Sequence, residues 1–146
     1  MNDQPAEWRR GEYTISTERR RLDVVAVLEL LRQTHWAHEL TAAQLERAVA
    51  HSVCFGVYRD DALVGFGRVI TDLATYGYLT DVVVAAAHRG HGLGSWLTEC
   101  MVSHPELQGF RRLALLTRDG EALYARAGFT LGPGSLVYME RRGGAI

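Results

Sequence analysis

A glycine-rich loop at residues 89–94, with the sequence Arg-Gly-His-Gly-Leu-Gly, constrains the fold of this chain more than any other segment. Before it lies an apolar Val-Val-Val run at residues 82–84, which is typical of a strand buried on both faces. After it, apolar residues recur from Leu93 to Met101 at the spacing of an amphipathic helix. A buried strand, a tight loop and a helix in this order predict a mixed α/β domain.

The first third of the chain predicts one strand and two helices. Residues 13–17 alternate between polar and apolar side chains, as a half-buried strand does, and residues 21–33 carry apolar side chains at helical spacing. Thr41 is a favourable N-cap for a second helix. The polar residues 1–10 are expected to be loose.

Strand patterns dominate the rest of the chain. A helix is expected at residues 119–127, with Gly128 as its left-handed C′ residue, and a hairpin around the Gly-Pro-Gly turn at residues 132–134 is expected to follow. The predicted strands are residues 53–58, 63–71, 75–84, 113–116, 129–131 and 136–140. We therefore expect one α/β domain over residues 1–146, with a central mixed, largely antiparallel sheet of about seven strands flanked by about four helices.

Composition and cysteine usage narrow the class of protein. The net charge of −1 gives no indication of a nucleic-acid or anionic-membrane partner. No window approaches the ~20 apolar residues of a membrane span, and residues 1–10 lack the apolar core of a signal peptide. Cys54 and Cys100 lie in apolar surroundings and are expected to be buried free thiols. These features favour a cytoplasmic protein.

The glycine loop is suited to binding a pyrophosphate. Gly90, Gly92 and Gly94 remove Cβ atoms where a ligand would approach the backbone. Successive N–H groups at the start of a helix form a positively polarised site for phosphate. Arg89 adds a full positive charge beside it. A glycine-rich turn with no ligand is the alternative, although three alternate glycines are costly in conformational entropy.

Spacing excludes two other phosphate-binding loops. A Walker A loop ends in Gly-Lys-Ser/Thr, and this chain has no lysine, since all 16 basic residues are arginine. A dinucleotide fingerprint requires a third glycine at the position that Ser95 occupies. The predicted antiparallel strands before the loop also replace the parallel βαβ unit of that fold.

Two motifs of the chain resemble those of the GNAT superfamily of N-acetyltransferases. Arg89-x-x-Gly92-x-Gly94 is similar to the acetyl-CoA pyrophosphate signature Gln/Arg-x-x-Gly-x-Gly/Ala. The segment 123–129, Leu-Tyr-Ala-Arg-Ala-Gly-Phe, resembles the Leu-Tyr-x-x-x-Gly-Phe segment of that superfamily. The order of predicted elements also resembles the GNAT fold over nearly the whole chain, residues 13–140.

The resemblance implies an acetyl-CoA site between the strand before the loop and the strand after the loop helix. Pantetheine would accept and donate hydrogen bonds along the main chain of the valine run, and the N–H groups of the loop would bind the pyrophosphate. Thr117 stands where many members have an asparagine that contacts pantetheine, and its reach is shorter. The implied cofactor-binding residues are Val82, Val83, Val84, Arg89, Gly90, His91, Gly92, Leu93, Gly94, Ser95, Thr117 and Tyr124.

Acyl transfer to an amine requires a base for the amine, donors for the oxyanion and an acid for the leaving thiolate. Tyr124 stands at the general-acid position of the family, and the alternative is a tyrosine that only packs on the sheet. Asp81 stands where similar enzymes place a glutamate that acts as the general base, and the alternative is a structural carboxylate. Asp72 and Tyr78 are further candidates for the base.

The resemblance also indicates where the acceptor and the oxyanion would lie. The segment His-Trp-Ala-His at residues 35–38 would cover the acceptor pocket, and the alternative is that its side chains are ordinary surface residues. A backbone N–H of Val83 or Val84 would meet the oxyanion. A metal site is not expected, because His35 and His38 lack a cysteine or carboxylate partner at usable spacing.

The function that the resemblance implies is transfer of an acetyl group from acetyl-CoA to a primary amine of a small molecule or peptide. The acceptor itself is unidentified. The alternatives are a non-catalytic acetyl-CoA-binding sensor or partner-binding module, and an acyltransferase that uses a longer acyl-CoA. Both a monomer and a homodimer are compatible with the sequence.

Overall fold

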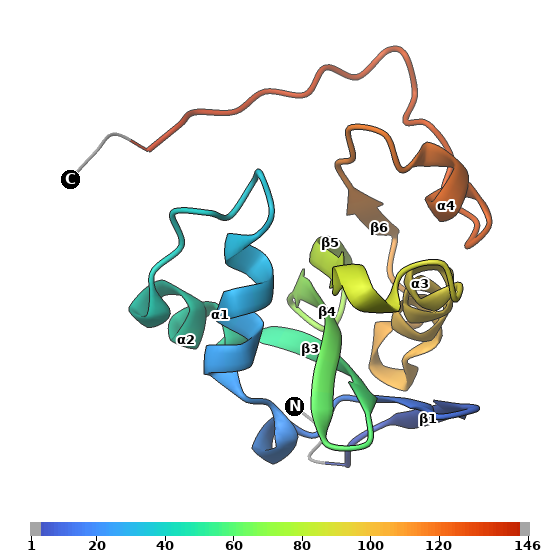
Figure 1. The fold of residues 1–146 in the computed structure, drawn as a ribbon. Coiled ribbons are helices and arrows are strands. Elements are labelled where there is room, and N and C mark those ends of the chain that lie inside the picture. Colours follow the sequence, from blue (N-terminus) through green and yellow to red (C-terminus); the bar gives the residue numbers. More distant parts are fainter. Residues whose placement is uncertain (1–3, 144–146) are drawn as a thin grey trace.

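Six strands form one sheet in the computed structural model, which describes residues 4–143 (Figure 1). Their spatial order is the order of the chain, and neighbours are antiparallel except for the last pair, which is parallel. The strands are β1 (Glu7–Arg10), β2 (Tyr13–Ser16), β3 (Ser52–Arg59), β4 (Ala62–Thr71), β5 (Tyr76–Val84) and β6 (Arg112–Leu115). The mixed, largely antiparallel sheet expected from the sequence is confirmed.

Helices cover both faces of this sheet. The helices are α1 (Val24–Arg32), α2 (Ala42–Ala50), α3 (Leu93–Ser103) and α4 (Glu121–Ala125), with short 3-10 helices η1 (Arg19–Arg21), η2 (Ala86–His88) and η3 (Pro105–Leu107). In Figure 1, α1 and α2 lie on one side of the strands, and α3 and α4 lie on the other. No helix of residues 4–143 is long and apolar enough to cross a membrane.

Each face of the sheet has its own apolar core, because successive strand residues point to opposite faces. On the α3 side, the buried cluster includes Phe55, Leu79 and Leu97. On the α1 and α2 side, it includes Leu31 and Phe66. The sheet is therefore packed between two helical layers, with one apolar core on each face.

Local capping fixes where α1 and α2 begin. The carboxylate of Asp23 accepts hydrogen bonds from the N–H groups of Val25 and Ala26. Thr41 forms the expected N-cap, and its capping box is completed by Gln44. The Thr41 cap also fixes where the irregular loop between the two helices ends, and this loop carries Trp36.

Two features of β5 shape the region around the valine run. Its register with β4 shifts so that two residues, Asp81 and Val82, lie opposite Gly67, and Asp81 has a φ of 57°. Pairing with β6 stops at Leu79, although β5 continues to Val84. The second half of β5 therefore has a β-bulge and an edge with no strand partner among the described residues.

The N-terminal segment corrects the expectation that residues 1–10 are loose. Residues 7–10 form β1, which pairs with β2 across a turn at Gly11, where φ is 57°. Trp8 anchors the strand, because its ring lies 6.0 Å from that of Phe55 in the core. Residues 1–3 lie outside the described part of the chain.

The end of the chain corrects a second expectation. The hairpin predicted at residues 129–131 and 136–140 is absent, and no residue from 129 to 143 belongs to a strand. The sheet consequently has six described strands rather than about seven, because β1 adds one and the hairpin removes two. The strand pattern is present in the sequence, but the segment has no neighbouring strand in its own domain.

Burial of the valine run is also less complete than its sequence predicts. Only Val83 is buried, on the α1 side, whereas Val82 and Val84 are half-buried. Pairing of β5 with β6 ends at Leu79, so Val82 and Val84 have no neighbouring strand on that side.

Candidate functional site

A cavity of about 430 Å³ lies between the loop that follows α1 and the second half of β5. Its lining residues are Gln33, Thr34, His35, Trp36, Val82, Val83, Val84 and Arg89. The cavity therefore joins the expected acceptor segment to the expected cofactor strand and to the first residue of the glycine loop. Its size is within the range of pockets that bind small molecules.

The glycine loop leaves backbone N–H groups available at the start of α3. Gly92 is the N-cap of the helix and offers no side-chain cap. The first intrahelical bond runs from Trp96 N–H to the Gly92 carbonyl (3.1 Å), so the N–H groups of residues 93–95 have no partner within the helix. These three donors, at the positive end of the helix dipole, fit a pyrophosphate.

The three glycines of the loop have different roles. Gly90 and Gly92 have φ values of 85° and 72°, which side-chain-bearing residues rarely adopt. An added Cβ at either position would meet no atom within 4 Å. Gly94 instead lies close to α4, because an added Cβ would be 3.2 Å from Leu123 Cδ1. The first two glycines shape the loop, and the third allows α3 and α4 to pack together.

Side chains attach the loop to the sheet. The Nε of Arg89 donates to the carbonyl of Val84 (3.1 Å), which places the exposed guanidinium at the end of β5. His88 Nδ1 lies 3.0 Å from the hydroxyl of Tyr13, in hydrogen-bond contact. His91 is exposed, and its ring lies 6.3 Å from that of Tyr13.

The main chain of the valine run is oriented toward the open edge of β5 at two positions. Ala85 N–H donates to the Val64 carbonyl on β4 (2.8 Å). Because main-chain groups of successive strand residues point to opposite edges, those of Val83 also point to β4. Those of Val82 and Val84 point away from β4. The N–H groups of Val82 and Val84 are therefore better oriented than that of Val83 to contact an oxyanion at this edge.

Asp81 is fixed at the bulge by two hydrogen bonds. Its Oδ2 accepts from Arg68 Nε (2.7 Å), and its Oδ1 accepts from Trp36 Nε1 (3.2 Å). The side chains of Arg68 and Asp81 are only 15% and 10% exposed. Arg68 also donates to Ser52 Oγ (3.0 Å), which donates to the Ala48 carbonyl (2.6 Å). The carboxylate thus connects the bulge to Trp36 and, through Arg68 and Ser52, to α2.

The sequence pattern alone did not predict Arg68 as a site residue or its contact with Asp81. The available signal was a single arginine in the otherwise apolar strand at residues 62–70. An arginine in such a strand needs an anionic partner when it is buried. The partner lies thirteen residues away, on the neighbouring strand, which the periodicity of one strand does not indicate.

Tyr124 lies half-buried on α4, and burial raises the pKa of its phenol above the ordinary value. Its ring makes an edge-to-face contact with Phe129 at 6.1 Å. The Thr117 hydroxyl accepts a hydrogen bond from Gly120 N–H (2.9 Å) and so organises the entry to α4. The structure gives Thr117 a role in a turn, and its hydroxyl proton stays available for a second bond.

Asp72, a further candidate for the base, forms a turn. It accepts hydrogen bonds from the N–H groups of Ala74, Thr75 and Tyr76 and from the Thr75 hydroxyl. The bonds from Thr75 hold the pKa of this carboxyl well below its usual range. Tyr78, the other candidate, has its phenol pKa raised, first by burial. A carboxylate with so low a pKa is a weak base, which disfavours Asp72.

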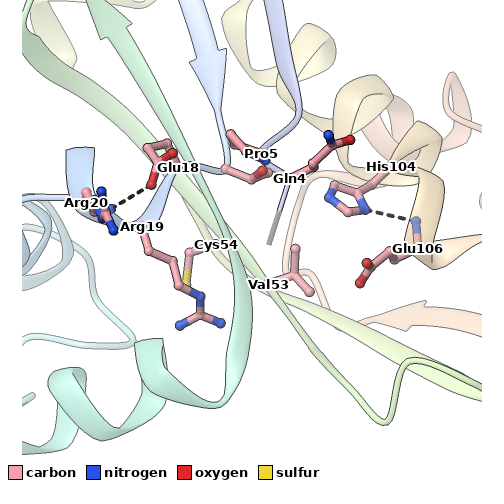
Figure 2. Close-up of a pocket in the computed structure, with 10 residues that line it drawn as sticks. Gln4, Pro5, Glu18, Arg19, Arg20, Val53, Cys54, His104 and Glu106 are labelled. Atoms are coloured by element: carbon pink, nitrogen blue, oxygen red, sulfur yellow. Dashed lines mark hydrogen bonds between the residues drawn. The ribbon is translucent and has the colours of Figure 1, made fainter. Parts of the chain in front are cut away.

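A second cavity, of about 500 Å³, has a different lining, which Figure 2 shows. None of the expected site residues lines it; Arg19, Val53, Cys54 and His104 are among those that do. Burial raises the pKa of the Cys54 thiol to about 11, so it is a poor nucleophile. Cys54 and Cys100 are both free and buried. Within residues 4–143, no group of three or more His, Cys, Asp or Glu is placed to hold a metal.

Comparison with known proteins gives consistent results over most of the chain. The model of the Acetyltransferase (GNAT) family matches residues 7–129. A Gibberella zeae protein named as an acetyltransferase is 35% identical over 145 residues, which span 84% of this chain and 81% of that protein.

Solved structures show the same fold. A GNAT-family acetyltransferase structure from Xanthomonas campestris has a TM-score of 0.83 and 44% identity, and covers 90% of this chain and 93% of that one. A Mycobacterium tuberculosis protein solved in complex with CoA has a TM-score of 0.67 and 24% identity, over 85% and 75% of the two chains. The family match, the relatives and the site geometry agree, and the chain belongs to the GNAT family of acetyltransferases, enzymes of the N-acyltransferase class.

Proposed function

We propose that this enzyme transfers an acetyl group from acetyl-CoA directly to a primary amine of a small molecule or peptide, with Tyr124 as general acid. The observation that carries the proposal is the cavity that joins the valine run of β5 to the segment around Trp36. An acyl donor along β5 and an acceptor beneath the Trp36 segment would then lie on opposite sides of one space. Direct transfer requires both reactants to meet in this way.

The glycine loop would bind the pyrophosphate of acetyl-CoA. The free N–H groups of residues 93–95 supply three donors, and the guanidinium of Arg89 supplies charge beside them. The left-handed backbone at Gly90 and Gly92 keeps Cβ atoms out of the approach. The donor set is neutral or positive throughout, as an anionic ligand requires.

The open edge of β5 would bind the pantetheine arm and the thioester. Main-chain groups of Val82 and Val84 point to this edge and can pair with the amides of pantetheine as a strand would. The N–H group that faces the thioester oxygen would stabilise the negative charge that develops there. This N–H group would be that of Val82 or Val84 rather than that of Val83.

Asp81 would receive the proton of the acceptor amine. Arg68 and Trp36 fix both of its oxygens, and a carboxylate has further lone pairs for a third donor. The new C–N bond forms as the C–S bond breaks. The amine proton passes to Asp81, directly or through water, and the phenolic proton of Tyr124 passes to the departing sulfur. The two buried free thiols fit the cytoplasmic location that we propose for the enzyme.

Thermal unfolding with acetyl-CoA tests the cofactor assignment. Acetyl-CoA should raise the Tm of the wild type, and Gly92→Glu should abolish the shift, because the new carboxylate fills the anion site. Gly109→Glu is the matched control, because Gly109 also has a positive φ (79°) and open space around its missing Cβ. It should lose a similar amount of stability and keep the shift. A shift with NAD or ATP but none with acetyl-CoA would contradict the assignment.

A panel of amines, with release of free CoA thiol as the readout, tests the reaction. Thiol release that depends on an amine supports transfer to nitrogen, and Asp81→Asn should lower kcat/KM for that amine. Release with alcohols alone, or a wild type that is active only with longer acyl-CoA donors, would contradict the proposed reaction.

A further inference from the structure

The last described segment, residues 130–143, extends away from its own domain beyond Phe129, which still packs against the core. Figure 1 shows it leaving α4 and running beyond the sheet with no strand beside it. Its apolar side chains are open to solvent, with Leu131, Val137 and Met139 being 80%, 82% and 85% exposed. An extended apolar segment that buries no surface gains nothing from the hydrophobic effect, so a partner surface would stabilise it.

The outer edge of β6 lacks a strand partner among the described residues. β6 is the last strand of the sheet, and it pairs with β5 on one side only. Its backbone groups on the other side are therefore available for a further strand. Leu116, the residue after β6, is 57% exposed. The described part of the domain thus has an unpaired sheet edge at β6 and an unpaired apolar segment that follows α4.

The segment and the edge match in an antiparallel register. With Glu140 opposite Arg112, the following pairs are Leu113 with Met139, Ala114 with Tyr138, Leu115 with Val137, and Leu116 with Leu136. One pair joins opposite charges and the others join apolar side chains, which stabilises a two-strand ladder. A shift by two residues in either direction puts Arg112 opposite Tyr138 or Arg142, and so loses the charge pair.

We propose that residues 136–140 of one chain add as a strand to β6 of a second copy, which returns its own segment in the same way. A two-fold dimer presents the same surfaces from both subunits, so both sheet edges are completed together. The segment is directed outward by a turn in which Leu136 N–H donates to the Pro133 carbonyl (3.0 Å). In the dimer, β6 of each chain would pair with residues 136–140 of the other chain.

The exchange would also bring a side chain of the second copy to the acceptor side of the sheet. Tyr78 pairs with Ala114 on β6, so their side chains share a face. Arg68, which binds Asp81, is on that face too, because it lies two residues from the partner of Tyr78 on β4. Tyr138 of the second copy, opposite Ala114, would continue this row. Only this consequence rests on the proposed function, and the exchange itself does not.

Molar mass in solution, measured by light scattering after size exclusion at micromolar concentration, tests the exchange. The wild type should have the mass of two chains, and Val137→Asp with Met139→Asp should have the mass of one, with unchanged circular dichroism. Val25→Asp is the matched control, because Val25 is 65% exposed on α1, and it should remain a dimer. A wild type with the mass of one chain, or a doubly substituted variant that remains a dimer, would overturn the proposal.

Cysteine pairing distinguishes exchange from pairing of the segment with its own β6. Chains carrying Ala114→Cys and chains carrying Tyr138→Cys are refolded together and oxidised. A covalent dimer that contains one chain of each kind supports exchange, since Cys54 and Cys100 are buried and do not compete. If one chain carrying both substitutions forms only an internal disulfide, the segment closes on its own domain and the proposal is wrong. Neither readout uses acetyl transfer.

Discussion

Asp81 is the residue whose conformation most directly connects backbone geometry to chemistry. Its φ of 57° is uncommon for a residue with a side chain, although aspartate tolerates it better than most. The strain, roughly 1–3 kcal/mol for such residues, is maintained because Arg68 and Trp36 hold the carboxylate. The bulge turns this side chain toward Trp36, where a regular strand would place it differently.

Tyr124 allows a sharp test at the same scale. Tyr124→Phe should leave the acetyl-CoA shift in Tm unchanged and lower kcat by roughly 10²-fold, the lower end of the usual effect of a general acid. Burial raises the phenol pKa, so the acid form persists to a higher pH than usual. The wild-type kcat should therefore hold as pH rises toward about 10, the ordinary tyrosine value.

The control for this prediction is a comparison of initial rates over the same pH range in both proteins. A Phe variant with the wild-type rate would remove Tyr124 as the acid. A wild-type rate that falls on the alkaline side well below pH ~10 would indicate a different acid, because a raised pKa moves the loss of the proton upward.

At the scale of elements, the ends of helices and strands decide what is available for binding. α3 begins at a glycine with no side-chain cap, so its first N–H groups are available to a ligand. It ends at His104, whose Nδ1 accepts a hydrogen bond from Glu106 N–H (3.1 Å) and so caps η3. One end of this element is suited to an anion, and the other is closed by its own side chain.

The His104 cap predicts a pH dependence of stability. Burial lowers the pKa of this histidine in the folded protein, and its cap requires an unprotonated Nδ1. The unfolded chain therefore binds the proton more readily. The stabilisation is complete above the unfolded pKa of about 6.5 and is lost as pH falls below it.

Urea unfolding at pH 7.5 and pH 5 measures this effect. The wild type should lose more free energy of unfolding on acidification than His104→Asn, because asparagine caps a helix without titrating. The variant should be less stable at both values, since the imidazole also contacts Phe55 at 5.6 Å between ring centroids. Equal losses in the two proteins would show that His104 is not responsible.

At the scale of the whole molecule, a sheet with helices on both faces ends at β6, where an apolar segment of the same chain does not pair with it. The two cores lie on opposite faces and are continuous along β3 to β5. β6 contributes only four residues to the sheet, and residues 136–140 of the same chain do not pair with its outer edge. A second copy supplies the missing strand without any new type of contact.

This arrangement predicts that stability depends on protein concentration. If unfolding requires dissociation of exchanged chains, the Tm of the wild type should rise with concentration, because mass action favours the dimer. The Tm of the Val137→Asp, Met139→Asp variant should stay constant over the same range. Differential scanning calorimetry at several concentrations provides the measurement, and a wild-type Tm that does not change would contradict linked dissociation.

The sequence by itself determined the local elements and the family. Periodicity, the Thr41 cap and the glycine loop are properties of neighbouring residues, so α2, α3 and β3 to β5 were predicted within a few residues of their observed ends. The loop spacing excluded two other phosphate folds, and the two motifs indicated acetyl-CoA. Such signals are read without knowledge of distant contacts.

Tertiary structure alone decided the features that depend on residues far apart in the chain. The Arg68–Asp81 pair exists because a bulge on β5 brings the two side chains together across strands. β1 is ordered because Trp8 reaches a core made by later residues. The segment at 129–143 has a strand pattern but no strand, because a strand forms only where a neighbour provides its hydrogen bonds. Which neighbour that is depends on the arrangement of the whole molecule.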